Sequence, residues 1–149
     1  MDVDGVLTDG GMYYGKNGEV LKKFNTRDGM GIQLLHQAGI KTAIITQERT
    51  DIIAHRAKKL EIKEVYQGIK DKCKALDIIL RKNNFNYDEV AYIGDDINDI
   101  SILNKVGFAV CPKDAHKDVK ENVDYICSKI GGQGAVRELC ELIISNKVL

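Results

Sequence analysis

The sequence has no tryptophan, a single proline, no net charge and no long hydrophobic run. Its 22 basic residues balance 22 acidic ones. No basic run is interleaved with aromatic residues, which argues against nucleic acid as a partner. No apolar stretch approaches the ~20 residues that a membrane-spanning helix needs. What remains, over residues 1–149, is the composition of a single globular domain able to bury about two thirds of its unfolded surface.

The cysteines and histidines form no recognisable metal or redox motif. No two cysteines make a Cys-x-x-Cys pair, which would suggest zinc or a redox dithiol. A chain of this size builds its own core and has little need of disulfides. We therefore predict ordinary buried thiols and a cytoplasmic protein, and we assign no histidine to catalysis. The residues concerned are Cys73, Cys111, Cys127, Cys140, His36, His55 and His116.

Short apolar runs alternate with segments of helical spacing along most of the chain. Such alternation predicts right-handed crossovers around a parallel sheet, hence an α/β domain with Rossmann-like architecture and flanking helices. We predict strands over 41–46, 64–67, 90–95 and 107–110, with a further short one at 125–128. We predict helices over 28–38, 50–60, 71–83, 98–105 and 134–145.

One segment breaks this alternation. Residues 11–14 and 20–24 flank Gly15-Lys16-Asn17-Gly18, in which Asn-Gly is a strong hairpin-turn signal. We predict a β-hairpin that projects from the sheet edge over about 11–24. The hairpin could simply cover its own core, but an isolated two-stranded ribbon is marginal in water. Its apolar side chains therefore favour self-assembly.

Two acidic loops suggest chemistry. The first is Asp2-Val3-Asp4-Gly5-Val6-Leu7-Thr8-Asp9-Gly10, and the second is Gly94-Asp95-Asp96-Ile97-Asn98-Asp99, just after the apolar run 90–93. Carboxylates at the ends of parallel strands gather at one sheet edge, where a hard cation such as Mg²⁺ relieves their repulsion. Asp and Asn are also common in turns and at helix N-caps, so each loop alone is weak evidence.

The order of four motifs strengthens the functional interpretation. Between the two acidic loops come Thr46, after the apolar run 43–45, and then Lys72. In this order the motifs resemble those of the haloacid dehalogenase superfamily of phosphohydrolases. Many members carry a large cap domain between the motifs, and the intervals here are too short for one. The resemblance therefore implies an uncapped phosphatase whose site is closed by oligomerisation.

Phosphate-ester hydrolysis becomes easier when a carboxylate forms a covalent intermediate, and we assign that role to Asp2. Asp4, two residues on, can protonate the leaving oxygen and then deprotonate water. The resemblance implies that the Asp4 main-chain carbonyl joins the carboxylates of Asp2 and Asp95 around Mg²⁺.

Thr46 and Lys72 would contact the transferring phosphoryl oxygens. Taken alone, Thr46 could be only a helix cap and Lys72 only a solvated lysine; their place between the acidic loops favours the catalytic interpretation. Asp96 and Asp99 fit an outer role, orienting Lys72 or a metal-bound water.

A closer resemblance covers essentially the whole chain. The first acidic loop and hairpin, with residues 24–32, 66–72 and 131–138, look like the 3-deoxy-D-manno-octulosonate 8-phosphate phosphatase family. Its members are capless, Mg²⁺-dependent homotetramers whose hairpins meet at the centre and whose neighbouring subunits help to close each site. The resemblance implies hydrolysis of a sugar-acid phosphate, the phosphate ester of a 3-deoxy-2-ulosonic acid, for surface-glycan (lipopolysaccharide) synthesis.

The segment after Thr46 departs from that family. Where its members typically have Gly-Arg, this chain has Gln47-Glu48-Arg49-Thr50. Glu48, together with Arg56 and Lys59, is similar to the 2-keto-3-deoxynononate 9-phosphate phosphatases, which act on nine-carbon acids of the sialic acid type. The alternative for these three residues is a solvated helix face.

The glycine-rich segment 131–134 lacks both the strand of a dinucleotide fingerprint and the Lys-Ser/Thr of a P-loop. We expect it to be a flexible lead-in to the final helix. By resemblance it could reach a neighbouring active site, with Arg137 near the substrate carboxylate.

A non-catalytic alternative stays open: a tetramerisation module related to domains attached to sugar-acid cytidylyltransferases. Such modules often lose catalytic carboxylates, whereas Asp2, Asp4 and Asp95 are all present here. Phosphotransfer between two sugars would need an acceptor pocket that no motif specifies.

Only Met1 precedes Asp2, although the resemblance places this nucleophile at the end of a central apolar strand of ~5 residues. We therefore expect the natural chain to begin several residues earlier, with an apolar stretch.

Overall fold

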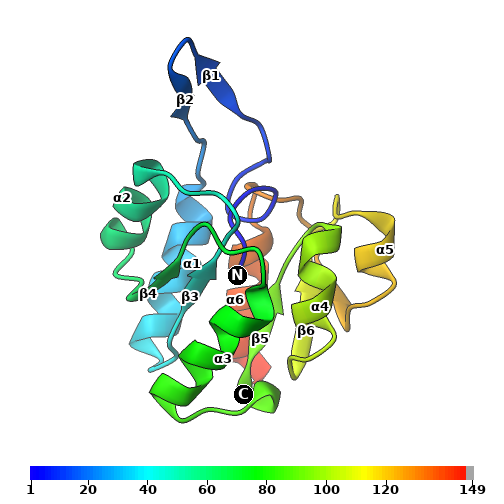
Figure 1. The fold of residues 1–149 in the computed structure, drawn as a ribbon. Coiled ribbons are helices and arrows are strands. Elements are labelled where there is room, and N and C mark those ends of the chain that lie inside the picture. The colour runs from blue at the N-terminus through cyan, green and yellow to red at the C-terminus, as the bar shows by residue number, and fades with distance from the viewer. Residues whose placement is uncertain (147–149) are drawn as a thin grey trace.

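A computed structural model, which describes residues 1–146, has the predicted α/β architecture without a cap domain (Figure 1). There are two parallel sheets: one pairs β3 with β4, and the other has the strand order β5-β6-β7. The strands are β3 (Ala43–Ile45), β4 (Glu64–Tyr66), β5 (Ala91–Ile93), β6 (Phe108–Cys111) and β7 (Tyr125–Ile126). Each corresponds to a strand predicted from the sequence.

Helices cover both faces of these sheets (Figure 1). The longer helices are α1 (Thr26–Gln37), α2 (Asp51–Lys59), α3 (Lys72–Asn83) and α6 (Ala135–Asn146). The predicted helix 98–105 is shorter and divided into the 3-10 helix η2 (Ile97–Asp99) and α4 (Ile100–Leu103). Sequence periodicity did not predict α5 (Lys117–Lys120) or the 3-10 helix η1 (Tyr87–Glu89), because four residues or fewer carry no repeating pattern.

The core has two parts, one on each face. Apolar side chains of α1, α2 and α6 form the first, including Ile32, Ile53 and Val136. Side chains of α3 and α4, including Leu76 and Ile102, form the second. The fold therefore has three layers, with the strands in the middle, and positions one shared sheet edge for the polar loops.

Met1 and Asp2 lie in the gap between β3 and β5, near the centre of the molecule (Figure 1). The Met1 amine donates to the Ala43 carbonyl at 3.0 Å, and the Met1 carbonyl accepts from the Ile45 N–H at 3.0 Å. On the other side, the Asp2 N–H donates to the Ile93 carbonyl at 3.1 Å. These three hydrogen bonds join the two sheets.

Beside Met1 the same gap widens into an apolar cavity of about 370 Å³. Its walls come from β3, β5, α3 and α6, with Ile45, Leu76, Ile93 and Val136 among them. We call this cavity the apolar slot. The edges of β3 and β5 and apolar side chains surround this cavity, and no side chain among residues 1–146 fills it.

The predicted hairpin is present and stands away from the body (Figure 1). It pairs β1 (Tyr13–Gly15) antiparallel with β2 (Gly18–Leu21), and an isolated bridge between Thr8 and Phe24 closes its base. Tyr14 is 66% exposed and Leu21 is 60% exposed. Met12 and Tyr13 are each about half exposed. The hairpin therefore does not bury its apolar side chains in its own subunit.

The four cysteines are buried free thiols, as predicted. Among residues 1–146, no helix combines the length and the apolar character needed to cross a membrane.

Candidate active site

A polar cavity of about 510 Å³ opens at the carboxyl edge of the strands. Two acidic loops and the segment after β3 meet there, which is the convergence that the sequence predicted. We call it the acidic pocket. Its polar lining residues are Asp2, Asp4, Thr46, Gln47, Glu48, Asp95, Asp96 and Asn98.

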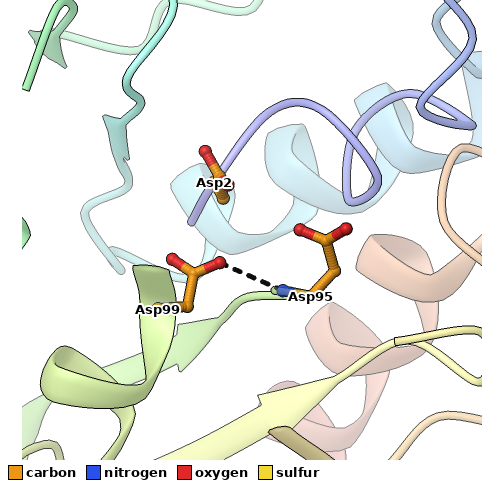
Figure 2. Close-up of side chains that lie close together, drawn as sticks. All are labelled: Asp2, Asp95 and Asp99. Carbon is orange, nitrogen blue, oxygen red and sulfur yellow. Dashed lines mark hydrogen bonds between the residues drawn. The ribbon is translucent and has the colours of Figure 1, made fainter. Parts of the chain in front are cut away.

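Three carboxylates lie close together, and two of them, Asp2 and Asp95, line the acidic pocket (Figure 2). Asp2, Asp95 and Asp99 each offer an oxygen, and these oxygens lie within 4.8 Å of one another. Asp99 already accepts three hydrogen bonds: one oxygen accepts from Lys72 at 2.6 Å and from the Tyr92 hydroxyl at 2.7 Å, and the other accepts from the Asp95 N–H at 3.1 Å. Asp99 thus holds its neighbours, and Asp2 and Asp95 are the carboxylates left for a cation.

The electrostatics of Asp2 and Asp95 fit a cation site. Burial, together with the negative charge of Asp99, raises the pKa of Asp2 from 3.8 to about 6. Burial and the charges of Asp2, Asp99 and Asp96 raise the pKa of Asp95 to about 7. A divalent cation between them would reverse both shifts, because it favours the ionised form of each carboxylate. An oxygen-only donor set of this kind suits Mg²⁺.

Lys72, the first residue of α3, has a side chain with no exposed surface. Asp71 caps the helix by accepting from the Lys74 N–H. The Lys72 ammonium lies 2.9 Å from an Asp2 oxygen and 2.6 Å from Asp99. Lys72 is therefore no solvated lysine, and its charge sits beside the proposed nucleophile.

Sequence reasoning missed Tyr92, which is buried on β5 and donates to Asp99. Burial and the Asp99 charge raise the pKa of this phenol well above its ordinary value, so it remains a donor. A tyrosine in an otherwise aliphatic buried strand was the available signal, because a buried hydroxyl needs a partner.

Thr46 is buried directly after β3, and its N–H donates to the Tyr66 carbonyl at 2.9 Å. Its hydroxyl oxygen accepts from the Glu48 N–H at 3.2 Å, which folds the 46–48 loop over the pocket. The helix cap of α2 is Thr50, whose side chain accepts from the Ile52 N–H. The alternative in which Thr46 caps that helix is therefore wrong.

Asp96 is exposed, and its side chain accepts from the Ile97 N–H at the start of η2. Lys72 is oriented by Asp99 and Asp2 rather than by Asp96. Of the two outer roles predicted for Asp96, only the one toward a metal-bound water remains a prediction.

The predicted substrate residues divide between pocket and surface. Glu48 lines the acidic pocket, whereas Arg56 and Arg137 do not. Arg56 donates to the Asn25 carbonyl at 3.0 Å and lies over the Phe24 ring. Arg137 pairs with Glu141 at 2.6 Å, and Lys59 is exposed near the end of α2. A substrate role for these basic residues stays a prediction.

The glycine-rich segment leads into α6 as predicted, but it is not the flexible connection that we expected. Gly131 and Gly132 are buried against the first acidic loop, and the Gly132 N–H donates to the Val6 carbonyl at 2.9 Å. A Cβ on Gly131 would overlap the Gly5 carbonyl oxygen. Asp28 of α1 accepts from the Gly134 and Arg137 N–H groups. Close backbone packing therefore explains these glycines, and the segment supports the catalytic loop.

A second unforeseen residue is Lys22, just after β2. Its side chain is completely buried, and its ammonium lies 2.6 Å from Asp4 and 2.8 Å from Glu19. Burial opposes its charge, but the hydrogen bonds to Asp4 and Glu19 outweigh burial and raise the pKa of Lys22. In the sequence this residue is indistinguishable from a solvated hairpin lysine.

Comparisons with known proteins agree with this geometry. The haloacid dehalogenase-like hydrolase family matches residues 36–139. The 3-deoxy-D-manno-octulosonate 8-phosphate phosphatase KdsC of Escherichia coli K12 is 43% identical over 144 residues, which cover 97% of this chain and 77% of that protein. The Yersinia pestis KdsC is 44% identical over 143 residues, covering 96% of this chain and 76% of that protein.

Solved structures of similar proteins include the 3-deoxy-D-manno-octulosonate 8-phosphate phosphatase of Moraxella catarrhalis in complex with magnesium, phosphate and KDO. It has a TM-score of 0.93 and 41% identity, over 97% of this chain and 83% of that one. The cobalt-bound phosphatase of Haemophilus influenzae has a TM-score of 0.94 and 38% identity, over 97% and 84% of the two chains.

Proposed function

This chain belongs to the haloacid dehalogenase-like hydrolases, and we propose that it is a Mg²⁺-dependent phosphatase acting on 3-deoxy-D-manno-octulosonate 8-phosphate. The observation that carries the proposal is the buried contact between Lys72 and Asp2 beside Asp95. It brings a carboxylate, a buried ammonium and a candidate cation site together beside the acidic pocket, which Asp2 and Asp95 line. The identity to curated octulosonate phosphatases supports the choice of substrate.

In this proposal Asp2 and Asp95, with the main-chain carbonyl of Asp4, hold Mg²⁺. The ion would neutralise phosphate and carboxylate charge, so that an anionic nucleophile can approach an anionic ester. The raised pKa values of Asp2 and Asp95 support this assignment, because burial and neighbouring carboxylate charge both disfavour the ionised forms that a cation would stabilise. The magnesium in the Moraxella catarrhalis structure supports the identity of the metal.

Two steps complete the reaction. The Asp2 carboxylate attacks phosphorus, and the bond from phosphorus to the sugar oxygen breaks while Asp4 gives that oxygen a proton. A water molecule then gives a proton to Asp4 and attacks the aspartyl-phosphate, which frees phosphate and restores the Asp2 carboxylate. Lys72 and the Thr46 hydroxyl would contact the phosphoryl oxygens, where negative charge is spread in the transition state.

The exposed hairpin supports a homotetramer in this proposal. Tyr14 and Leu21 present apolar surface well away from the body of the subunit. Packing of hairpins from several subunits would bury that surface and bring neighbouring chains over each acidic pocket. Light scattering on the wild type and a Tyr14→Ser, Leu21→Ser double variant tests this. A wild-type tetramer and a double variant of smaller molar mass support the assembly, whereas a wild-type monomer contradicts it.

The test of the function is release of phosphate from octulosonate 8-phosphate with Mg²⁺, compared with the same assay in EDTA. We expect turnover only with the metal. A nine-carbon nonulosonate 9-phosphate is the second substrate to assay, because Glu48 lines the pocket. A wild type that assembles but hydrolyses neither ester would support the non-catalytic tetramerisation module instead.

A further inference from the structure

Asp4 is held through only one of its two oxygens. Oδ1 accepts from the Lys22 ammonium at 2.6 Å and from the Thr8 hydroxyl at 3.4 Å. Oδ2 is buried and has no hydrogen-bond partner among the described residues. Asp4 also lines the acidic pocket, so the carboxyl group that Lys22 and Thr8 anchor at Oδ1 borders the space in which a substrate would lie.

Lys22 is fully buried and contacts Asp4 directly. A lysine with no exposed side-chain surface is rare, because taking an ammonium out of water is costly unless carboxylates surround it. Glu19 of β2 supplies the second carboxylate at 2.8 Å. The neighbouring Lys23 is the ordinary case: it is 57% exposed and pairs with Asp9 at 2.7 Å, outside the acidic pocket.

We propose that Lys22 is the positioning residue for proton transfer at Asp4. This inference rests on the proposed phosphatase function. When the bond from phosphorus to the sugar oxygen breaks, the proton moves from Asp4 to that oxygen, and Asp4 is left as a carboxylate. The Lys22 ammonium faces that carboxylate and stabilises the charge that the transfer creates.

A consequence concerns the hairpin. Lys22 directly follows β2, and Glu19 lies within that strand. The only anchors of the Asp4 side chain among the described residues are therefore Thr8 in its own loop and a lysine at the base of the hairpin. Proton transfer thereby depends on how the hairpin is seated.

The dependence on the leaving group tests the inference. A 4-nitrophenolate leaves readily as an anion, whereas phenolate and a sugar alkoxide need a proton as they depart. We compare kcat/KM for 4-nitrophenyl phosphate and phenyl phosphate, a ratio that reports only the steps through phosphoryl transfer. The ratio is taken within one preparation, so a partly misfolded variant gives the same value as a fully folded one.

We expect Lys22→Met to lower kcat/KM for phenyl phosphate about 30-fold more than for 4-nitrophenyl phosphate, within the range of general acid catalysis. Lys23→Met, the matched control, should leave the ratio unchanged. Glu19→Gln should shift the ratio in the same direction by less, and it serves as the second variant if Lys22→Met is inactive with both esters. Equal losses with both esters in Lys22→Met, or in Glu19→Gln if that variant replaces it, would overturn the inference. A wild type that hydrolyses no ester would instead overturn the proposed function.

Discussion

The acidic pocket and the apolar slot meet at Met1 and Asp2, which lie in the gap between β3 and β5. On one side, Asp2 and Asp95 crowd negative charge into a buried site. On the other, Ile45 and Ile93 face a cavity of about 370 Å³. Both regions carry a free-energy cost, but the costs differ in kind, because one comes from like charges and the other from unfilled apolar space.

The comparison shows what each region needs. A cation relieves the repulsion at the acidic pocket, whereas apolar groups suit the slot, because its walls are mainly apolar side chains. The two needs are separable by experiment, because a metal acts on charge and a filled slot acts on packing. The following predictions separate them, starting with the largest effect.

Removing the nucleophile should have the largest effect on activity, in a protein that still folds. Asp2→Asn is expected to lower kcat by more than about 10³-fold, since the amide cannot form the aspartyl-phosphate. Asp9→Asn is the matched control in the same loop, because Asp9 pairs with Lys23 outside the pocket. Phosphate release measures activity, and circular dichroism checks the fold. Full activity of Asp2→Asn with saturating Mg²⁺ would disprove the mechanism.

Filling the apolar slot should act on stability. Adding five apolar residues before Met1 would place apolar side chains beside this cavity. Each buried apolar side chain adds about 1.5–3 kcal/mol to the free energy of unfolding. The conformational entropy lost when the added chain becomes ordered offsets much of this gain. We expect the thermal midpoint to rise by roughly 5 °C or more. A Gly-Ser extension of equal length is the control, and equal midpoints for the two extensions would contradict the slot argument.

The pH dependence of stability should reveal the cost of burying these carboxylates close together. Without metal, the folded-state pKa values of Asp2 and Asp95, about 6 and about 7, exceed the ordinary value of 3.8. The folded chain therefore binds more protons than the unfolded chain between about pH 4 and 7, so these groups lower the free energy of unfolding as pH rises. The Met1 amine acts oppositely between about pH 5 and 8, because burial lowers its pKa from 8.0 to about 5.

Asp95→Asn isolates one of these contributions. In EDTA, the free energy of unfolding should fall between pH 4 and 7 in both proteins. The fall should be about 1–3 kcal/mol smaller in the variant than in the wild type. Urea unfolding at each pH provides the measurement, and Asp96→Asn is the exposed neighbouring control. If the free energy of unfolding depends on pH in the same way in the wild type and in Asp95→Asn, burial and neighbouring charges do not raise the pKa of Asp95.

The smallest expected effect concerns selectivity. Glu48 lies at the acidic pocket, so Glu48→Ala should lower kcat/KM for a nonulosonate 9-phosphate about 5-fold more than for octulosonate 8-phosphate, roughly the size of one hydrogen bond. Lys59→Ala tests whether a neighbouring subunit contributes to the same selectivity. Equal changes for both esters in each variant would return Glu48 and Lys59 to the solvated-surface interpretation.

Sequence patterns were sufficient where the determining interactions are local. The alternation of apolar runs predicted β3 to β7, and Asn17-Gly18 predicted the hairpin turn. The order of Asp2, Thr46 and Asp95 predicted the convergence of loops, because parallel strands end at one edge. Boundaries and very short helices such as α5 were less predictable, since they lack a repeat.

The sequence by itself determined the family, the strand order along the chain and the residues that meet at the sheet edge. Only the tertiary structure decided that Lys72 is sandwiched between Asp2 and Asp99, and that Lys22 rather than its neighbour Lys23 reaches Asp4. It likewise decided that Gly131 is packed against Gly5. The physical reason is that a lysine or a glycine has the same local pattern in a loop, on a surface or in a core. Its role depends on burial and on partners far away in the chain, which only folding supplies.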